Sequence, residues 1–372
     1  MRFGVPKEAD HYETRVAMVP DTVKALIKKG HAVVVQTGAG LTASISDADF
    51  AAAGATIAAD WNGVLSGCDC LLRIQPFSES EVAALPEGKA VIGFLAPARN
   101  TALVQALAKK RITSFSMDAI PRITRAQSMD ALSSMATVAG YKAVLLAASH
   151  LPKFIPMLTT AAGTIRPSKV LILGAGVAGL QAIATARRIG AIVEAYDVRP
   201  AAKEQVKSLG ATFVEAPVAN DSETKGGYAK EVSAEVLAQQ RKLLHEHVAA
   251  ADIVITTAQV PGKPAPRLVT KEMVAAMKAG SVIVDLAAET GGNCELTEPG
   301  LVATKNNITI IGLKNLPATV PLDASRMLAR NFMAFILEIT KDKEFTFDWK
   351  NEIFRETCIT LNGEVNQKRS NQ

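Results

Sequence analysis

The sequence has few aromatic residues, few cysteines and no strong charge of either sign. Aromatic residues make up 5% of the 372 residues, so the hydrophobic cores must consist mainly of alanine, valine, leucine and isoleucine. The four cysteines lack the paired spacing of a zinc site and are typical of buried free thiols in a reducing compartment, so we predict no metal site. The net charge of +5 is spread along the chain without an arginine-rich run, which argues against a nucleic-acid partner.

The sequence also lacks signals for export and for membrane insertion. The first ten residues contain no apolar core of a signal peptide, and no uncharged apolar run of about 18–20 residues occurs. The most apolar helical stretch lies near 129–150 and carries Lys142 in its middle. We therefore expect a chain that does not itself span a membrane.

Short apolar runs alternate with amphipathic segments along the first 120 residues. Strands are predicted at 3–5, 32–36, 70–74, 91–95 and 112–115, and helices at 22–29, 47–53 and 101–110. Asp21 and Asn100 precede two of these helices and are predicted to cap them. Strands separated by helices indicate a parallel sheet with right-handed crossovers.

The second half of the chain repeats this alternation and predicts a second parallel sheet. Its six strands, the number in a doubly wound nucleotide-binding domain, are predicted at 170–173, 191–196, 212–214, 253–256, 282–285 and 308–311. Helical patterns at 129–150 and about 327–339 flank this region. We therefore predict an α/β fold with two Rossmann-like doubly wound domains, both with parallel sheets, joined by long helices. The predicted domains are a discontinuous one at 1–130 plus 312–372 and a nucleotide-binding one at 131–311.

The strongest motif has the order of a dinucleotide-binding unit: strand, glycine turn, helix, strand and acid. Gly174 permits a tight turn, Gly176 lets the backbone approach a pyrophosphate, and Gly179 lets the helix pack close to the strand. Asp197 lies 18 residues after Gly179 (197 − 179), where a carboxylate can accept a hydrogen bond from a ribose 2′-OH. Its charge favours NAD(H) over NADP(H), although the nearby Arg199 can accept a 2′-phosphate. The alternative is a plain glycine-rich turn between a core strand and a core helix.

The loop 122–130 is the densest polar cluster in an apolar neighbourhood. Arg122, Gln127 and Asp130 offer a guanidinium, an amide and a carboxylate that can orient a nicotinamide carboxamide and its ribose. The same residue types also suit the start of a helix. Thr124-x-x-Gln127 has the spacing of a capping box, and an acid in the first turn is favoured by the helix dipole. From the sequence alone, both interpretations stay open.

Other polar residues follow predicted strands, where open α/β sheets bind their ligands. They are Lys7, Glu8, Arg15, Gln259, Asp285 and Glu289, the last of which is equally compatible with a solvated loop acid. The polar segment 220–247 interrupts the second sheet and is longer than a tight connection needs. It is either a mobile loop over a site or a solvated surface crossover.

Taken together, these motifs resemble one family along nearly the whole chain. Alanine dehydrogenases and the NAD(H)-binding component of proton-translocating NAD(P) transhydrogenase share segments that resemble residues 2–8, 15–17, 174–191 and 282–300. A similarity to the transhydrogenase component, and not to alanine dehydrogenases, covers residues 121–130, 226–231 and 256–266.

The resemblance implies an enzyme that acts as one subunit of a complex. This chain would bind NAD(H) and pass a hydride directly to NADP+ held by a separate NADP(H)-binding subunit, with coupling to proton movement by a membrane-spanning subunit. Because the chain ends at Gln372 without a spanning helix, we expect the soluble α1-type subunit of a split enzyme. The family implies a homodimer and a cytoplasmic location, peripherally associated with the inner membrane through partner subunits.

The resemblance also implies roles for individual residues. It implies nicotinamide-side contacts from Arg122, Gln127, Asp130 and Ser133. Besides the three glycines of the turn, it implies NAD contacts from Val177, Asp197, Val198, Arg199, Gly227 and Gln259. Tyr228 is implied to be the tip of a mobile loop that closes on the nucleotide.

A chemical argument separates the two activities of this family. An alanine dehydrogenase forms and breaks C–N bonds and therefore needs titratable groups beside its substrate. Similar enzymes place a lysine after the third strand and a histidine after the fourth, where this chain has Gln75 and Ala96. Hydride transfer between two nicotinamides needs positioning and exclusion of water, not a general base. The alternatives are an amino-acid dehydrogenase with another acid/base set and a non-catalytic NAD-sensing module.

Overall fold

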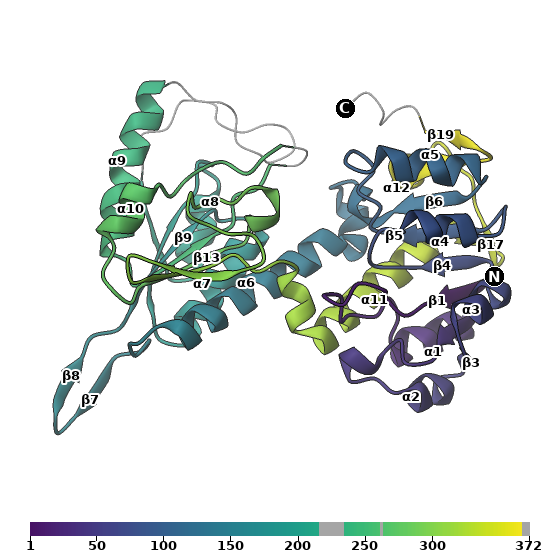
Figure 1. The fold of residues 1–372 in the computed structure, drawn as a ribbon, viewed down its shortest axis with the longest axis horizontal. Helices are drawn as coiled ribbons and strands as arrows, with labels where there is room; N and C mark the ends of the chain where they lie inside the picture. Colours follow the sequence, from purple (N-terminus) through teal and green to yellow (C-terminus); the bar gives the residue numbers. More distant parts are fainter. Residues whose placement is uncertain (216–233, 261–262, 367–372) are drawn as a thin grey trace. The chain divides into compact units, whose positions relative to one another are not determined.

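The computed structural model describes residues 1–215, 234–260 and 263–366, which fold into two compact units (Figure 1). One unit consists of Met1–Met135 with Pro317–Gln372, and the other of Ala136–Leu316. The division falls within a helix of twenty residues, α6 (Ala131–His150). Each unit has its own sheet dominated by parallel strands, which confirms the predicted α/β class.

The first unit contains an eight-stranded sheet in the order β19-β18-β6-β5-β4-β1-β2-β3. Its parallel strands are β1 (Arg2–Val5), β2 (Ala32–Gln36), β3 (Thr56–Ala58), β4 (Cys70–Leu72), β5 (Ala90–Gly93) and β6 (Thr113–Ser116). The antiparallel strands β18 (Cys358–Leu361) and β19 (Glu364–Val365) extend the β6 edge. Because these last two strands come from the end of the chain, the unit is discontinuous in sequence.

The helices of this unit include two short ones that the sequence did not reveal, α3 and α4. In chain order they are α1 (Pro20–Lys28), α2 (Asp47–Ala52), α3 (Trp61–Gly67), α4 (Glu79–Ala84), α5 (Thr101–Lys109), α11 (Pro321–Ile339) and α12 (Glu352–Thr357). A 3-10 helix, η3 (Thr124–Met129), precedes α6, and the small hairpin of β16 (Thr340–Lys341) and β17 (Glu344–Phe345) follows α11.

The prediction that Asp21 caps the first helix is wrong. The helix begins one residue earlier, at Pro20, which suits a first helical position because it has no N–H to leave unpaired. The Thr22 hydroxyl accepts the N–H of the capping residue at 3.1 Å. Asn100 does stand at the N-cap of α5, but its side chain makes no capping bond, and its Nδ2 donates instead to the carbonyl of Leu95 (2.9 Å).

The second unit contains a seven-stranded sheet in the order β11-β10-β9-β12-β13-β15-β14. Its strands are β9 (Lys169–Leu173), β10 (Ile192–Tyr196), β11 (Thr212–Phe213), β12 (Ile253–Thr256), β13 (Val282–Asp285), β14 (Val302–Lys305) and β15 (Ile308–Ile311). The six predicted strands pair in parallel in the order 3-2-1-4-5-6, which is the order of a doubly wound dinucleotide-binding domain. The strand β14, which was not predicted, pairs antiparallel with β15 at the edge.

Helices and strands of the second unit enclose two hydrophobic clusters, one on each face of its sheet. Along β9, Val170 and Ile172 belong to one cluster and Leu171 and Leu173 to the other. The helices are α7 (Val177–Arg188), α8 (Ala202–Ser208), α9 (Ala234–Ala250) and α10 (Lys271–Ala276). By length and composition alone α6 could cross a membrane, but it packs residues such as Val144 into the first cluster. A hairpin of β7 (Leu158–Thr160) and β8 (Gly163–Ile165) projects from this unit (Figure 1).

Candidate nucleotide-binding site

Two glycines of the turn between β9 and α7 are required by the protein's own packing. Gly174 has a φ of +101°, and a Cβ on it would lie 2.5 Å from the Thr257 hydroxyl. A Cβ on Gly179, in the first turn of α7, would lie 1.8 Å from the carbonyl oxygen of Gly174. The helix therefore approaches the strand more closely than any other residue would allow.

The middle glycine of the turn has no such reason to be glycine. Gly176 is the N-cap of α7, with a φ of −76° that any residue adopts, and no atom of the described residues lies within 4 Å of a Cβ built on it. The next residue, Val177, is 44% exposed. The N-terminus of a twelve-residue helix, with its partial positive charge, therefore opens onto accessible space at this point.

Asp197 is placed beside this turn, but its carboxylate is already fully engaged. It lies just after β10 and accepts hydrogen bonds from the backbone N–H of Ala175 (2.7 Å) and of Arg199 (2.9 Å). The Arg199 guanidinium adds two more, from Nε (2.9 Å) and Nη2 (2.8 Å). Four donors fill the acceptor positions of a carboxylate. A ribose hydroxyl would therefore have to replace a donor, and the guanidinium is the one that can move.

The loop after β12 lies against the same turn. The Thr257 hydroxyl donates to the carbonyl of Gly174 (2.9 Å), and the exposed Gln259 donates from Nε2 to the carbonyl of Leu286 (2.9 Å). The fully buried Asn293 accepts the N–H of Ala258 (3.0 Å) and donates to its carbonyl (2.8 Å). Sequence reasoning missed Asn293, because its partners are backbone atoms more than thirty residues away.

Asp285, at the end of β13, supports the loop 286–297. Its buried carboxylate accepts from the Thr256 hydroxyl (3.0 Å), the N–H of Cys294 (2.9 Å) and the Thr297 hydroxyl (2.7 Å). With its acceptors satisfied inside the protein, Asp285 serves the fold. Glu289 is exposed and accepts the N–H of Asn315 (2.7 Å).

The loop 122–130 forms the 3-10 helix η3 and corrects one sequence interpretation. The predicted capping box of Thr124 and Gln127 does not form, because the N-cap of η3 is Ile123 and makes no side-chain bond. Asp130 instead binds the start of α6: its Oδ1 accepts the N–H of Ser133 (2.9 Å) and its Oδ2 accepts the Ser133 hydroxyl (2.6 Å). The predicted pair Asp130 and Ser133 is therefore brought together by helix capping.

The remaining predicted site residues are exposed or lie beyond the described chain. Arg122 and Gln127 are exposed on the loop 122–130, and Val198 lies between Asp197 and Arg199. Gly227 and Tyr228 lie outside the described residues, as does most of the predicted mobile segment 220–247 apart from α9.

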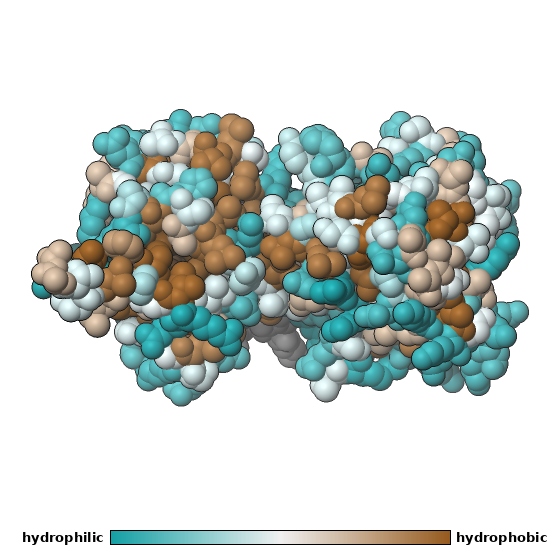
Figure 2. All heavy atoms as spheres, turned by 90° about the horizontal axis from the view of Figure 1, so that it is seen from below, coloured by the Kyte–Doolittle hydropathy of each residue, from teal (hydrophilic) through white to brown (hydrophobic). Residues whose placement is uncertain are grey.

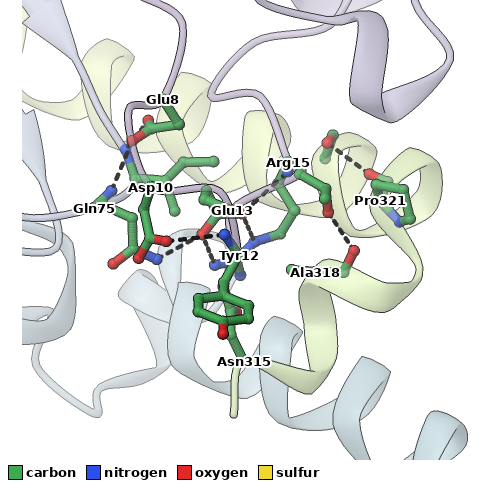
Figure 3. A network of polar contacts seen from close by, with 12 residues as sticks. Glu8, Asp10, Tyr12, Glu13, Arg15, Gln75, Asn315, Ala318 and Pro321 are labelled. Atoms are coloured by element: carbon green, nitrogen blue, oxygen red, sulfur yellow. Dashed lines mark hydrogen bonds and ion pairs between the residues drawn. The ribbon is translucent and has the colours of Figure 1, made fainter. Parts of the chain in front are cut away.

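The position of the family's lysine is part of a buried polar network in the first unit (Figure 3). Gln75 Nε2 donates to Glu13 (2.6 Å), whose carboxylate also accepts from the Arg15 guanidinium (2.6 Å). Glu8 accepts the backbone N–H of Ile74 (2.7 Å) and of Gln75 (3.2 Å). These contacts hold the loop that follows β1 and engage the Gln75 amide. The second family position, Ala96, lies after β5 with a φ of +45°.

Glu8 is the group of this network with a strongly shifted pKa. Burial raises the pKa of Glu8 to about 7, against the opposing attraction of Arg73 and the two backbone hydrogen bonds. The side chain is 4% exposed and 3.3 Å from the Arg73 guanidinium. A pKa near neutrality suits proton transfer, but here the carboxyl group is directed at backbone N–H groups and a buried arginine.

This shifted pKa predicts a pH-dependent contribution to stability. A raised pKa in the folded state means that the contribution of Glu8 is fully present below pH 4.5 and is lost as the pH rises through about 7. Glu8→Gln should therefore gain stability relative to the parent between pH 5 and 7.5, by about 2–3 kcal/mol. Urea unfolding of both proteins across this range measures it, and a difference independent of pH would contradict the shift.

The fold and the glycine turn together define a Rossmann-type nucleotide-binding protein. The family models described as alanine dehydrogenase/PNT, N-terminal domain and C-terminal domain match residues 4–139 and 143–368. The chain therefore belongs to the alanine dehydrogenase/PNT family, which confirms the resemblance inferred from the sequence.

Individual relatives place the chain nearer to transhydrogenases than to dehydrogenases. It is 45% identical over 369 residues to an NAD(P) transhydrogenase alpha subunit of Rickettsia prowazekii, covering 98% of this chain and 96% of that protein. A solved transhydrogenase structure from Sinorhizobium meliloti matches with a TM-score of 0.86 and 42% identity over 98% of both chains. The alanine dehydrogenase of Mycobacterium tuberculosis is 31% identical over 91% of this chain and 87% of its own length. The chain is thus a homologue of the alpha subunit of NAD(P) transhydrogenase.

Proposed function

We propose that this chain is the NAD(H)-binding subunit of a proton-translocating NAD(P) transhydrogenase. It would hold NADH and pass its hydride directly to NADP+ bound by a partner subunit. The observation that carries this proposal is Gly176, a glycine that the fold does not need and a close-lying pyrophosphate does. The helix N-terminus at Val177 supplies partial positive charge for the same group.

The residues of this chain would bind and orient the cofactor. Gly174, Gly176 and Gly179 would shape the phosphate cradle, and Asp197 and Gln259 would contact the adenosine side. Arg122, Gln127, Asp130 and Ser133 would orient the nicotinamide. When bound, NADH supplies the hydride, and no O–H or N–H proton moves at the reacting carbons. Gln75 and Ala96, which cannot titrate, support this chemistry over that of an amino-acid dehydrogenase.

Complementation with the partner tests the division of labour. The chain alone should bind NADH, seen by isothermal titration, without reducing NADP+. Adding the NADP(H)-binding subunit should start deuterium transfer from 4-deuterated NADH to NADP+. Robust NADP+ reduction by the chain alone would overturn the proposal. NADH oxidation that requires pyruvate and ammonia would indicate the dehydrogenase alternative. NADH-dependent partner affinity without any transfer would indicate a sensing module.

The proposal includes assembly with a membrane-spanning subunit, which would couple transfer to proton movement. This chain would then lie at the cytoplasmic face of the inner membrane, held there through its partners. Flotation of the chain with vesicles that contain the partner subunits, but not with empty vesicles, would support this location.

A homodimer is the further assembly that we propose. The hairpin of β7 and β8 has three residues in each strand, and so short a hairpin is marginally stable unless it packs on another surface. Large apolar residues on or beside it are exposed: Phe154, Met157 and Ile165, by 55%, 62% and 43%. Figure 2 shows apolar surface gathered at this end of the second unit. A second copy of the chain would cover it.

Charge placed on the hairpin should separate the copies. We expect light scattering to give twice the chain mass of 39.3 kDa for the parent, and the single-chain mass for the double variant Met157→Asp with Ile165→Asp. Leu301→Asp is the matched control, because Leu301 is 54% exposed in the same unit but away from the hairpin. A dimeric double variant would contradict this interface.

A further inference from the structure

The loop 122–130 is fastened to a helix that lies two hundred residues further along the chain. Asn331 on α11 is 5% exposed, and its Nδ2 donates to the carbonyl of Ser128 at 2.8 Å. Its Oδ1 is buried without a hydrogen-bond partner among the described residues. A buried acceptor without a partner is unfavourable, so an apolar side chain of similar size would suit packing alone better than asparagine. The bond to the loop is the gain that this amide offers.

A second anchor holds the same loop from the same helix. The Arg125 guanidinium contacts Glu338 (2.5 Å) on α11 and the side chain of Asn351 (2.9 Å). Asn351 in turn donates to Glu338 (2.8 Å), which closes a triangle of three side chains. Asn331 and Glu338 are seven residues apart, two turns, and therefore lie on one face of α11.

The two anchors flank one residue of the loop. Arg125 and Ser128 enclose Gln127, and Asp130 follows two residues later. The six residues of η3 form a 3-10 helix, whose hydrogen bonds are poorer than those of an α-helix and hold a short segment weakly. The position of Gln127 is therefore set from outside the loop, by the 19-residue helix α11.

We propose that Asn331 is a positioning residue for hydride transfer, with Glu338 as a second anchor. It fixes the place at which Gln127 and Asp130 meet the nicotinamide, without touching the cofactor itself. This inference rests on the proposed function. Because a displacement of about 1 Å in a positioning group can lower a rate about 100-fold, loss of the anchor should slow transfer more than it weakens binding.

The test compares variants of α11 in the complex with the NADP(H)-binding subunit. Asn331→Leu removes the whole amide, and Asn331→Asp keeps its shape but removes the donor. Single-turnover transfer should fall about 10- to 100-fold in both, with NADH affinity within about threefold of the parent. The two variants will differ in melting temperature, since only one buries a charge. Equal slowing despite unequal stability is a result that a merely structural role would not give.

Ser325→Ala is the matched control on the same helix. Ser325 is fully buried and its hydroxyl binds the N–H of Val16 (3.0 Å) and the carbonyl of Pro321 (2.6 Å), so its loss removes a buried polar contact away from the loop. We expect its transfer rate to stay within about twofold of the parent.

Other outcomes separate this inference from the proposed function. If the Asn331 variants do not fold, Glu338→Gln removes the partner charge of the exposed Arg125 and should still slow transfer several-fold. An unchanged rate in folded Asn331→Leu, or an equal fall in Ser325→Ala, overturns the inference. Absence of transfer in the parent complex would overturn the proposed function instead.

Discussion

Gly176→Ala is expected to abolish NADH binding while leaving the fold intact. The φ of Gly176 is open to alanine, and an added methyl group would meet none of the described atoms. Alanine also reduces the conformational freedom of the unfolded chain, which stabilises a compatible site by about 0.4–1 kcal/mol. We therefore expect an unchanged or slightly higher melting temperature, with NADH affinity at least about 100-fold weaker because the methyl group occupies the pyrophosphate's place.

Gly179→Ala should behave in the opposite way, and it makes the contrast sharp. Its methyl group would have to lie 1.8 Å from the Gly174 carbonyl oxygen, so helix and strand must move apart. We expect a clear loss of melting temperature in this variant. Undiminished NADH binding by Gly176→Ala, measured by isothermal titration, would remove the main support for the phosphate cradle.

Gln127→Ala is expected to slow hydride transfer far more than it weakens NADH binding. Gln127 is exposed, and no described side-chain contact gives it a structural task, so its loss should cost little stability. If its amide orients the nicotinamide, transfer in the reconstituted complex should fall by about 100-fold. The control is Thr124→Ala, which trims another exposed side chain of η3.

Asp130 needs a different substitution, because it also caps α6. Asp130→Ser keeps a favourable N-cap residue while removing the carboxylate, so stability should be nearly preserved and transfer should still fall. Transfer rates equal to the parent in both Gln127→Ala and Asp130→Ser would leave these residues with a purely structural role.

The sequence predicted the second sheet closely because its strands are uniformly apolar. Strands β12 and β13, buried on both faces, have the continuous runs that mark a parallel sheet. It did not predict β3, which has three residues, or the pairing of β18 with β6, which joins residues about 245 positions apart. Such contacts arise from tertiary packing that local periodicity does not encode.

The site was harder to predict than the fold, for a related reason. The acid at Asp197 and the three glycines follow a fixed spacing and could be placed from the sequence. The engagement of Asp197 by Arg199 depends on side-chain directions in the turn after β10, and the anchoring of Ser128 by Asn331 joins positions 203 residues apart. A local pattern such as Thr124-x-x-Gln127 misled, because η3 starts one residue away from the expected cap.

The bond from the N–H of Ala175 to Asp197 has a consequence for redesigning cofactor preference. Exchanging this acid for a small neutral residue, a common strategy for admitting a 2′-phosphate, would also untie the backbone that cradles the diphosphate. Engineers would then weaken grip on every nucleotide at once. Asparagine, which keeps an oxygen acceptor for that amide, is the replacement that leaves the turn tethered while removing the charge, and Arg199 would be released to meet the phosphate.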